Sequence, residues 1–246
     1  PFRFKGDEKP HVVFMIGEKE YDTASTLPLF AQKHLEYRGI RCTFVHVNKE
    51  DPDNFAGIGA LKDADLLFLS VRRRTPPKAQ LDLIRAHLAK GKPLVGIRTA
   101  SHAFDREPPS QRHARWTQFD DEILGVDYRQ HYGNRPPKDP ATVIQATVPG
   151  SKHPILTGVT QDAFEAKSHL YKNKLVATTV TVLMTGTLSG RAEISEPVAW
   201  TNEVNGSRVF YTSLGGVGDF SLPTFQRLLL NGVLWALDKP LPPADP

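Results

Sequence analysis

The chain has 246 residues, of which 39% are hydrophobic and 24% are charged, and its formal net charge is +4. This length suits one α/β domain spanning residues 1–246, and a charge this mild, with the single short basic run 72–74, excludes a nucleic-acid-binding arm. No apolar run is long enough to span a membrane. The one cysteine, Cys42, excludes an intramolecular disulfide and a CxxC metal site, and its place in a predicted strand indicates an inert thiol.

Strands and helices alternate over the first hundred residues. A continuous apolar run, His11–Gly17, is typical of a buried parallel strand. A helix follows over 27–35, with Ser25 or Thr26 as its cap and Gly39 as its stop. Further strands are predicted at 42–47, 64–71 and 93–97, and a second helix is predicted with Pro76 just inside its start and Gly91 just past its end. This alternation predicts a right-handed, doubly wound parallel sheet.

The fourth strand ends in a tight turn of small residues, from Gly96 to His102. Ligands of open α/β sheets bind outside the carboxyl ends of the strands, so chemistry is expected here. Amidotransferases of the glutaminase type present a nucleophilic cysteine on a turn of this shape, where this chain has Arg98. An arginine stays protonated and cannot act as a nucleophile. The sequence therefore predicts no glutaminase activity.

The regular alternation stops between Asp105 and Gly150, a segment punctuated by prolines. The segment contains Trp116, Tyr128 and His131, and disordered segments seldom contain such residue types. We therefore expect an ordered cap over the carboxyl edge of the sheet, with one strand at 141–148. The C-terminal part predicts a strand at 178–183, a hairpin of 197–201 and 208–213 around Asn205-Gly206, and a last helix from about Pro223 to Leu237.

Several blocks together resemble the ThuA-like (trehalose-utilisation) family. They are residues 70–74 (SVRRR), 96–104 (GIRTASHAF), 131–134 (HYGN), 153–155 (HPI), 196–201 (EPVAWT) and 211–215 (YTSLG). That family belongs to the class I glutamine amidotransferase-like superfamily. The resemblance implies a flavodoxin-like sheet, here with a C-terminal antiparallel hairpin and the irregular cap. It also implies a role in sugar metabolism, on disaccharides or their oxidised keto forms.

The chain departs from the family pattern twice. Many members carry histidine where Arg98 stands, and many carry Gly-His where this chain has Gly215-Gly216. Both departures remove an imidazole from the expected site. They therefore weaken a metal-based or histidine-based mechanism for this chain.

Two groups of residues are candidates for the site. The catalytic candidates are His102, His131 and Asp219, as acid–base groups. The substrate-binding candidates are Glu18, Tyr21, Arg72, Arg98, Ser101, Tyr132, Asn134 and Phe220. Because alternate residues of an extended segment share a face, Arg72 and Arg74 are expected to point the same way.

Alternatives stay open for the central residues. Arg98 either clamps a sugar oxygen or an anion, in an open cleft bordered by Glu18, Arg72, His102, His131 and Asp219, or is structural and paired with a carboxylate. His102 is either an acid–base group or a donor to a backbone carbonyl. A convergence of His102 and His131 across the pocket would favour an enzyme over a binding module.

Cofactors are not expected. No Gly-x-Gly-x-x-Gly follows the first strand, and no histidine spacing matches a zinc site, which leaves only an assembly of His102, His131 and Asp219 in space. Two function classes remain: an enzyme that hydrolyses or isomerises a sugar, and a non-catalytic carbohydrate-binding or regulatory protein. The expected partner is a small-molecule carbohydrate, with a homodimer as an option. The chain begins at Pro1, which a removed signal peptide or a trimmed sequence would explain, so no compartment is assigned.

Overall fold

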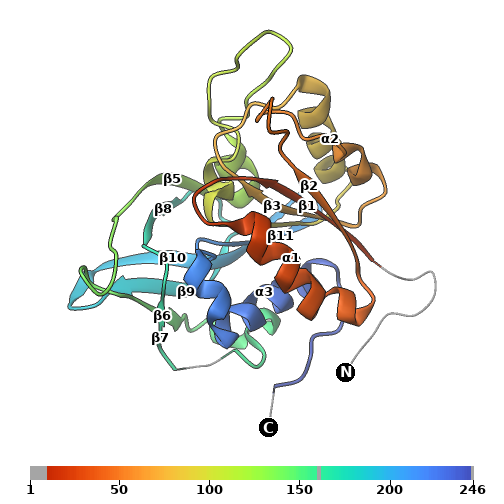
Figure 1. Cartoon of the computed structure of the whole chain (residues 1–246). Coiled ribbons are helices and arrows are strands. Elements are labelled where there is room, and N and C mark those ends of the chain that lie inside the picture. The colour runs from red at the N-terminus through yellow and green to blue at the C-terminus, as the bar shows by residue number, and fades with distance from the viewer. Residues whose placement is uncertain (1–9, 160–161, 245–246) are drawn as a thin grey trace.

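A nine-stranded sheet runs through the centre of the molecule, in the order β2-β1-β3-β4-β11-β10-β9-β6-β7 (Figure 1). The computed structural model describes residues 10–159 and 162–244. Its strands are β1 (His11–Gly17), β2 (Arg41–His46), β3 (Leu66–Val71), β4 (Leu94–Ile97), β5 (Val126–His131), β6 (Thr142–Ala146), β7 (Phe164–Ala166), β8 (Tyr171–Leu175), β9 (Thr181–Leu188), β10 (Arg191–Val204) and β11 (Ser207–Thr212). The α-helices are α1 (Thr23–His34), α2 (Lys78–Ala89) and α3 (Pro223–Ala236). None of the described helices is long and apolar enough to cross a membrane.

The first half of the sheet is parallel. β1 lies between β2 and β3, and β4 lies between β3 and β11, all in parallel register. The predicted α/β fold with a parallel sheet is confirmed. Beyond β11 the strands are antiparallel, because the hairpin of β10 and β11 continues into β9, β6 and β7. The antiparallel extension is thus larger than the predicted hairpin.

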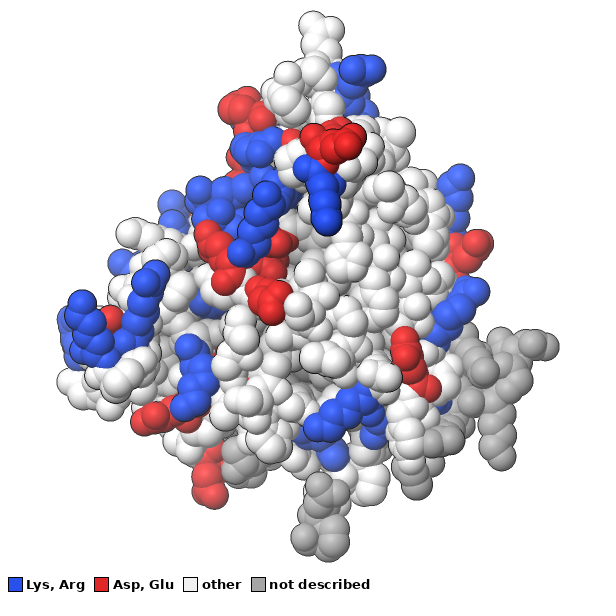
Figure 2. Space-filling model, in the orientation of Figure 1, with Lys and Arg blue, Asp and Glu red and all other residues white. Residues whose placement is uncertain are grey.

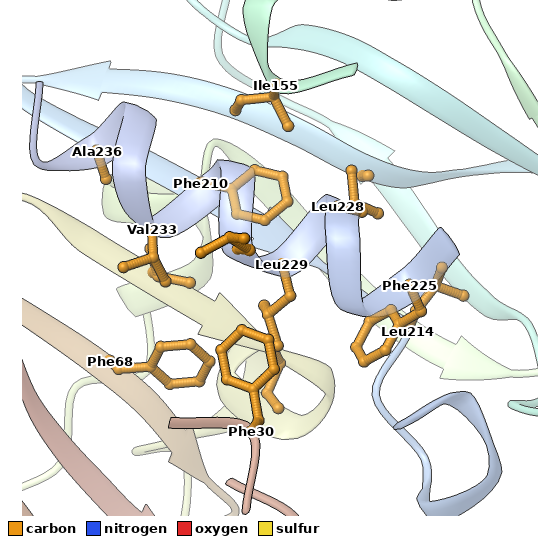
Figure 3. Packing of buried hydrophobic residues seen from close by; sticks show 14 of the residues in the cluster. Phe30, Phe68, Ile155, Phe210, Leu214, Phe225, Leu228, Leu229, Val233 and Ala236 are labelled. Carbon is orange, nitrogen blue, oxygen red and sulfur yellow. The ribbon is translucent and has the colours of Figure 1, made fainter. Parts of the chain in front are cut away.

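Each face of the sheet has its own apolar core. Val12 and Phe14 of β1 point to the face covered by α1 and α3, and Val13 and Met15 point to the face covered by α2. This follows from the alternation of side chains along a strand, and it explains why β1 is apolar throughout. Figure 3 shows the first core, in which residues of α3 pack against Phe68 and Phe210 of the sheet and Phe30 of α1.

Helix α1 begins at Thr23, three or four residues before the start that a cap at Ser25 or Thr26 predicts. The carboxylate of Glu18 accepts hydrogen bonds from the backbone amide and the hydroxyl of Thr23, at 2.8 and 2.6 Å. It also accepts from the amides of Glu20 and Tyr21. One side chain from the preceding turn therefore satisfies backbone donors where this earlier helix begins, and neither Ser25 nor Thr26 acts as the cap.

The segment between Asp105 and Gly150 is more regular than expected. It contributes a π-helical turn, Asp120–Leu124, and the strands β5 and β6. β6 joins the main sheet, whereas β5 pairs with β8 in a separate two-stranded antiparallel ribbon. This β5–β8 ribbon supplies one wall of the site described next.

Candidate functional site

A cavity of about 580 Å³ lies between the carboxyl ends of the parallel strands and the β5–β8 ribbon. Its floor comes from the segments that follow β1, β3 and β4, and its other wall comes from β5 and β8. The lining residues are Glu20, Tyr21, Arg72, Arg73, His102, Tyr128, Arg129, Gln130, His131, Arg135, His169 and Tyr171. The site is thus at the edge of the sheet where open α/β proteins bind ligands.

Two turns are tied together beneath this cavity. The turn after β4 begins with Arg98, whose φ of 51° is in the left-handed region, and its carbonyl oxygen accepts a hydrogen bond from the hydroxyl of Tyr211 at 2.5 Å. The turn after β3 donates from the amides of Arg73 and Arg74 to the carbonyl oxygens of His102 and Ala103, at 2.9 and 2.7 Å. These bonds hold His102 at the carboxyl edge of the parallel strands, where it lines the cavity.

Aromatic rings form one continuous wall of the cavity. The ring of His102 stacks on Tyr128 with centroids 4.3 Å apart, and Tyr128 contacts Tyr171 at 4.9 Å. His131 lies 4.5 Å from His169. The Tyr171 ring is 6.1 Å from His102 and 6.4 Å from His131, so the two predicted histidines share the cavity with a tyrosine between them.

The histidines of this wall are held neutral. Burial, with the positive charge of Arg73, Arg72 and Arg98 adding to it, lowers the pKa of His102 to about 3. Burial and the charge of Arg98 lower the pKa of His169 to about 3 as well, and the same two causes lower the pKa of His131. At neutral pH each ring therefore offers one donor and one acceptor nitrogen.

Arginines line the rim. Arg72 pairs with Glu20 at 3.0 Å. Arg72 and Arg74 were expected to share a face, but they point in different directions. Arg74 is buried and donates from Nε to the carbonyl oxygen of Gly17, whereas Arg72 and Arg73 both line the cavity. The physical reason is Arg73, whose φ of 49° interrupts the extended conformation on which the alternation depends.

Arg98 does not face the cavity, and this corrects the clamp expectation. Its side chain is fully buried, and its Nη1 donates to the carbonyl oxygens of His169, at 3.0 Å, and of Ser213. The guanidinium lies between two rings, 4.2 Å from the centroid of Tyr171 and 4.6 Å from that of Tyr21. The alternative of a carboxylate partner is not what the structure shows: among the described residues, no carboxylate lies within ion-pair distance of Arg98. Its partners are carbonyl oxygens, two aromatic faces and the hydroxyl of Tyr21. Arg98 supports the cavity from beneath.

Asp219 is a second correction, because it is fully buried and cannot act on a ligand in the cavity. Its carboxylate accepts hydrogen bonds from the amides of Lys167, Ser168, Gly215 and Gly216 and from the hydroxyl of Ser168. All of these donors come from two loops. The residue therefore fastens the segment after β11 to the segment before β8.

Five further candidates lie outside the cavity. Glu18 is bound to the α1 turn, and Asn134 bridges Pro140, Thr142 and Leu170 through its amide. Ser101 is buried, with its hydroxyl 3.1 Å from Nδ1 of His102. Tyr132 donates to Glu196 at 2.7 Å, and Phe220 packs beside Phe225. The side chains that the structure brings together from the candidate set are Tyr21, Arg72, His102 and His131.

Sequence reasoning missed His169 and Tyr171, which stand at the centre of the aromatic wall. The available signal was the run Ser168-His169-Leu170-Tyr171, in which the two aromatic side chains alternate with an apolar residue and so share a face. Leu170 takes the opposite direction, into the core. Such a polar aromatic pair, on one face of the segment that leads into β8, is the signal that predicts a lined pocket.

The described residues contain one group of side chains spaced closely enough for a metal ion: Asp120, Asp121 and Asp127. The spatial assembly of His102, His131 and Asp219 does not form, because Asp219 is buried between its two loops. The acidic group is tied to the fold instead, since Asp120 accepts from the amide of Tyr128 at 2.9 Å.

Solved structures with the same fold are known. A ThuA-like protein from Parabacteroides merdae aligns with a TM-score of 0.66 at 15% identity, over 94% of this chain and 91% of that one. The carbohydrate deacetylase Agd3 aligns with a TM-score of 0.64 at 13% identity, over 94% of this chain and 32% of that one. A β-galactosidase from Rahnella sp. R3 aligns with a TM-score of 0.60 at 11% identity, over 96% of this chain and 32% of that one. At these identities the likeness concerns the fold alone.

Among curated proteins, no sequence matches this chain. The family model described as trehalose utilisation, ThuA, matches residues 6–236, which is nearly the whole length. The chain therefore belongs to the ThuA (trehalose utilisation) family, and this membership points to a role in the utilisation of trehalose or another sugar.

Proposed function

We propose that this protein binds a carbohydrate in the cavity between the sheet edge and the β5–β8 ribbon. The observation that carries the proposal is the aromatic wall of three tyrosines and three histidines around a volume of about 580 Å³. That volume is within the ordinary range of small-molecule sites. The place of the cavity, at the carboxyl edge of a parallel sheet, supports the same reading.

The chemistry of this wall suits a sugar. Aromatic faces pack against the C–H face of a pyranose ring, while hydroxyls and ring nitrogens at their edges exchange hydrogen bonds with sugar hydroxyls. The hydroxyl of Tyr21 lies 3.3 Å from Nε2 of His169 and 3.4 Å from the hydroxyl of Tyr171. These three groups form a polar cluster beside the stacked pair of His102 and Tyr128.

Binding is better supported than hydrolysis. Glycoside hydrolysis ordinarily uses two carboxyl groups on either side of the scissile bond, and Glu20 is the single carboxylate among the described lining residues. A histidine whose pKa is about 3, as for His102 and His169, is a weak general base at neutral pH. Both observations support a non-catalytic binding protein on an amidotransferase-like scaffold.

Isomerisation of a bound keto-sugar is the second candidate. It rests on His131, the most exposed of the three cavity histidines, whose ring lies 4.5 Å from that of His169. Two imidazoles at this separation could exchange a proton through a bound hydroxyl. NMR of a keto-sugar incubated with the protein would reveal a new isomer, and the candidate requires that His131→Gln abolish its formation.

The scaffold under this site supports a flavodoxin-like assignment as one domain. The parallel order β2-β1-β3-β4-β11 is the order 2-1-3-4-5 of that class, when β11 is counted as the fifth strand. In this assignment the β5–β8 ribbon is the cap over the carboxyl edge, and its strand β5 comes from the expected cap segment.

Calorimetric titration with trehalose and keto-disaccharides tests the binding proposal. Tyr128→Ala removes a ring of the wall and should weaken binding roughly tenfold, since a stacked aromatic contact contributes about 1.4 kcal/mol. Tyr37→Ala is the matched control, because Tyr37 is exposed in the turn Glu36–Arg38, outside the cavity. Equal affinities for the two variants would place the sugar elsewhere, and no binding of any sugar would end the proposal.

A further inference from the structure

Four arginines surround the cavity. Arg72 and Arg73 follow β3, Arg129 belongs to β5, and Arg135 follows β5, so they come from both walls. Glu20 is the one acidic residue among the described lining residues. Figure 2 shows basic side chains gathered on the same side of the molecule as the β5–β8 ribbon of Figure 1, with a few acidic ones among them. This surplus of positive charge is more than a neutral sugar requires.

The ion pairs on the sheet side are weak enough to exchange. Arg72 meets Glu20 at 3.0 Å and Arg73 meets Asp105 at 3.8 Å, with between 34% and 52% of each side chain exposed to solvent. Pairs so exposed are screened by water and contribute little. In addition, Nε of Arg72 is buried and has no hydrogen-bond partner. Both arginines can therefore turn donors toward an incoming anion.

On the ribbon side, the charges are divided between two cavities. Arg129 pairs with Asp127, but Asp127 and Asp105 line a smaller neighbouring cavity of about 210 Å³. The stacked rings of His102 and Tyr128 line both cavities and separate them. The aspartates therefore line the smaller cavity, on one side of the stacked rings, and the arginines line the larger cavity on the other side.

Arg135 is the arginine with least compensation. Its backbone amide donates to Asp139 at 2.9 Å, but within residues 10–159 and 162–244 no carboxylate lies within ion-pair distance of its guanidinium. The lowered pKa values of the cavity histidines reflect the same excess of positive charge. After burial, arginines of the site are among the causes that lower the pKa of His102, His131 and His169.

We propose that the sugar bound in this cavity carries an anionic group, a carboxylate or a phosphate, held by Arg135 and Arg72. This inference rests on the proposed carbohydrate binding and narrows its ligand class. Arginine is suited to the task because its planar fork makes paired hydrogen bonds to carboxylate and phosphate oxygens. The aromatic wall would hold the sugar ring while the arginines hold the charged group.

Calorimetric titration with matched ligands tests the inference. The neutral probes are trehalose and glucose, and the anionic probes are trehalose 6-phosphate, glucose 6-phosphate and glucuronate, all of which keep the sugar ring. We expect the anionic derivative of each pair to bind roughly tenfold tighter or more, with affinity that falls as salt is added. A preference for glucose 6-phosphate over glucuronate would identify the group as a phosphate, and the reverse preference would identify it as a carboxylate.

Variants test which side chains are responsible. Arg135→Gln should weaken binding of the anionic probes roughly tenfold or more, and binding of the neutral probes by a clearly smaller factor. Glu20→Gln should strengthen binding of the anionic probes, because it removes the Glu20 carboxylate that competes with the ligand for Arg72. Arg191→Gln is the matched control for net charge, since Arg191 is an exposed arginine outside the cavity that pairs with Glu193.

The outcomes separate the two proposals. If neutral and anionic sugars bind equally tightly, or if Arg135→Gln behaves like Arg191→Gln, the anionic inference is wrong while carbohydrate binding stands. If no sugar binds, with or without charge, the proposed function itself fails. If inorganic phosphate binds as tightly as the sugar phosphates, the site is an anion site without a sugar subsite, and both proposals are wrong.

Discussion

Replacing Arg98 tests how the cavity is supported. The fully buried guanidinium donates to the carbonyl oxygens of His169 and Ser213 and lies between the rings of Tyr21 and Tyr171. In Arg98→Ala, each orphaned carbonyl costs about 1–3 kcal/mol. Each lost contact between the cation and a ring costs about 1–2 kcal/mol more. The desolvation of a buried charge, which opposes folding of the wild type by several kcal/mol, disappears at the same time.

The net loss that we expect for Arg98→Ala is about 3 kcal/mol of unfolding free energy, which corresponds to a melting temperature lower by about 6–12 °C for a chain of this size. Arg98→Lys should lose nearly as much, because an ammonium group is more strongly hydrated and cannot stack on the rings of Tyr21 and Tyr171 as the planar guanidinium does. Urea unfolding and thermal melts measure both variants. Arg191→Ala, at an exposed pair, should change stability by less than about 0.5 kcal/mol.

The opposite pattern would refute this reasoning. If Arg98→Ala melted within about 2 °C of the wild type and yet lost most of its sugar affinity, Arg98 would be a ligand-binding residue. Its burial and its contacts would then not represent the state that binds sugar.

Three other predictions concern single side chains. Asp219→Asn should lower the unfolding free energy by about 2–4 kcal/mol, because an amide cannot accept all five hydrogen bonds of the buried carboxylate; a urea titration measures this, and an unchanged midpoint would contradict it. His102 has a folded pKa of about 3, below its unfolded value, so the folded state prefers the neutral ring. Its contribution is complete above about pH 6.5 and is lost by about 1.4 kcal/mol per unit as pH falls toward 3. His102→Gln should therefore make the loss of stability in melts between about pH 4 and 7 less steep, while His169, whose pKa is also about 3, keeps its own share of the slope. Neither the wild type nor Cys42→Ser should release ammonia from glutamine faster than the uncatalysed reaction, because Cys42 lies in β2 and burial raises the pKa of its thiol to about 12. A glutamine-dependent rate in the wild type that the substitution abolished would overturn this prediction.

Local patterns predicted most of the regular elements. The predicted first strand has the bounds of β1, and the Asn205-Gly206 signal lies at the hairpin turn, where both residues have a positive φ. The last helix begins at Pro223 as expected, because proline is favoured at a first helical position. These features depend on a few neighbouring residues, so they can be recognised without tertiary contacts.

The site was predicted less completely, because its residues are placed by contacts between distant segments. Tyr21, Arg72 and His102 follow strand ends and could be expected at the sheet edge. The burial of Arg98 depends on Tyr171, which is 73 positions away in a ribbon that has no repeat or turn signal of its own. Asp219 looks like a site carboxylate from its position after β11, and only the contacts with the loop before β8 identify it as structural.

The location of the bound sugar is the most direct test of the account. We would record the histidine ring resonances during a titration with trehalose and trehalose 6-phosphate. The account predicts saturating shifts for His102, His131 and His169, and no shifts for His34 and His153, which lie outside the cavity. Saturation of binding without a shift at any of the three cavity histidines would contradict it.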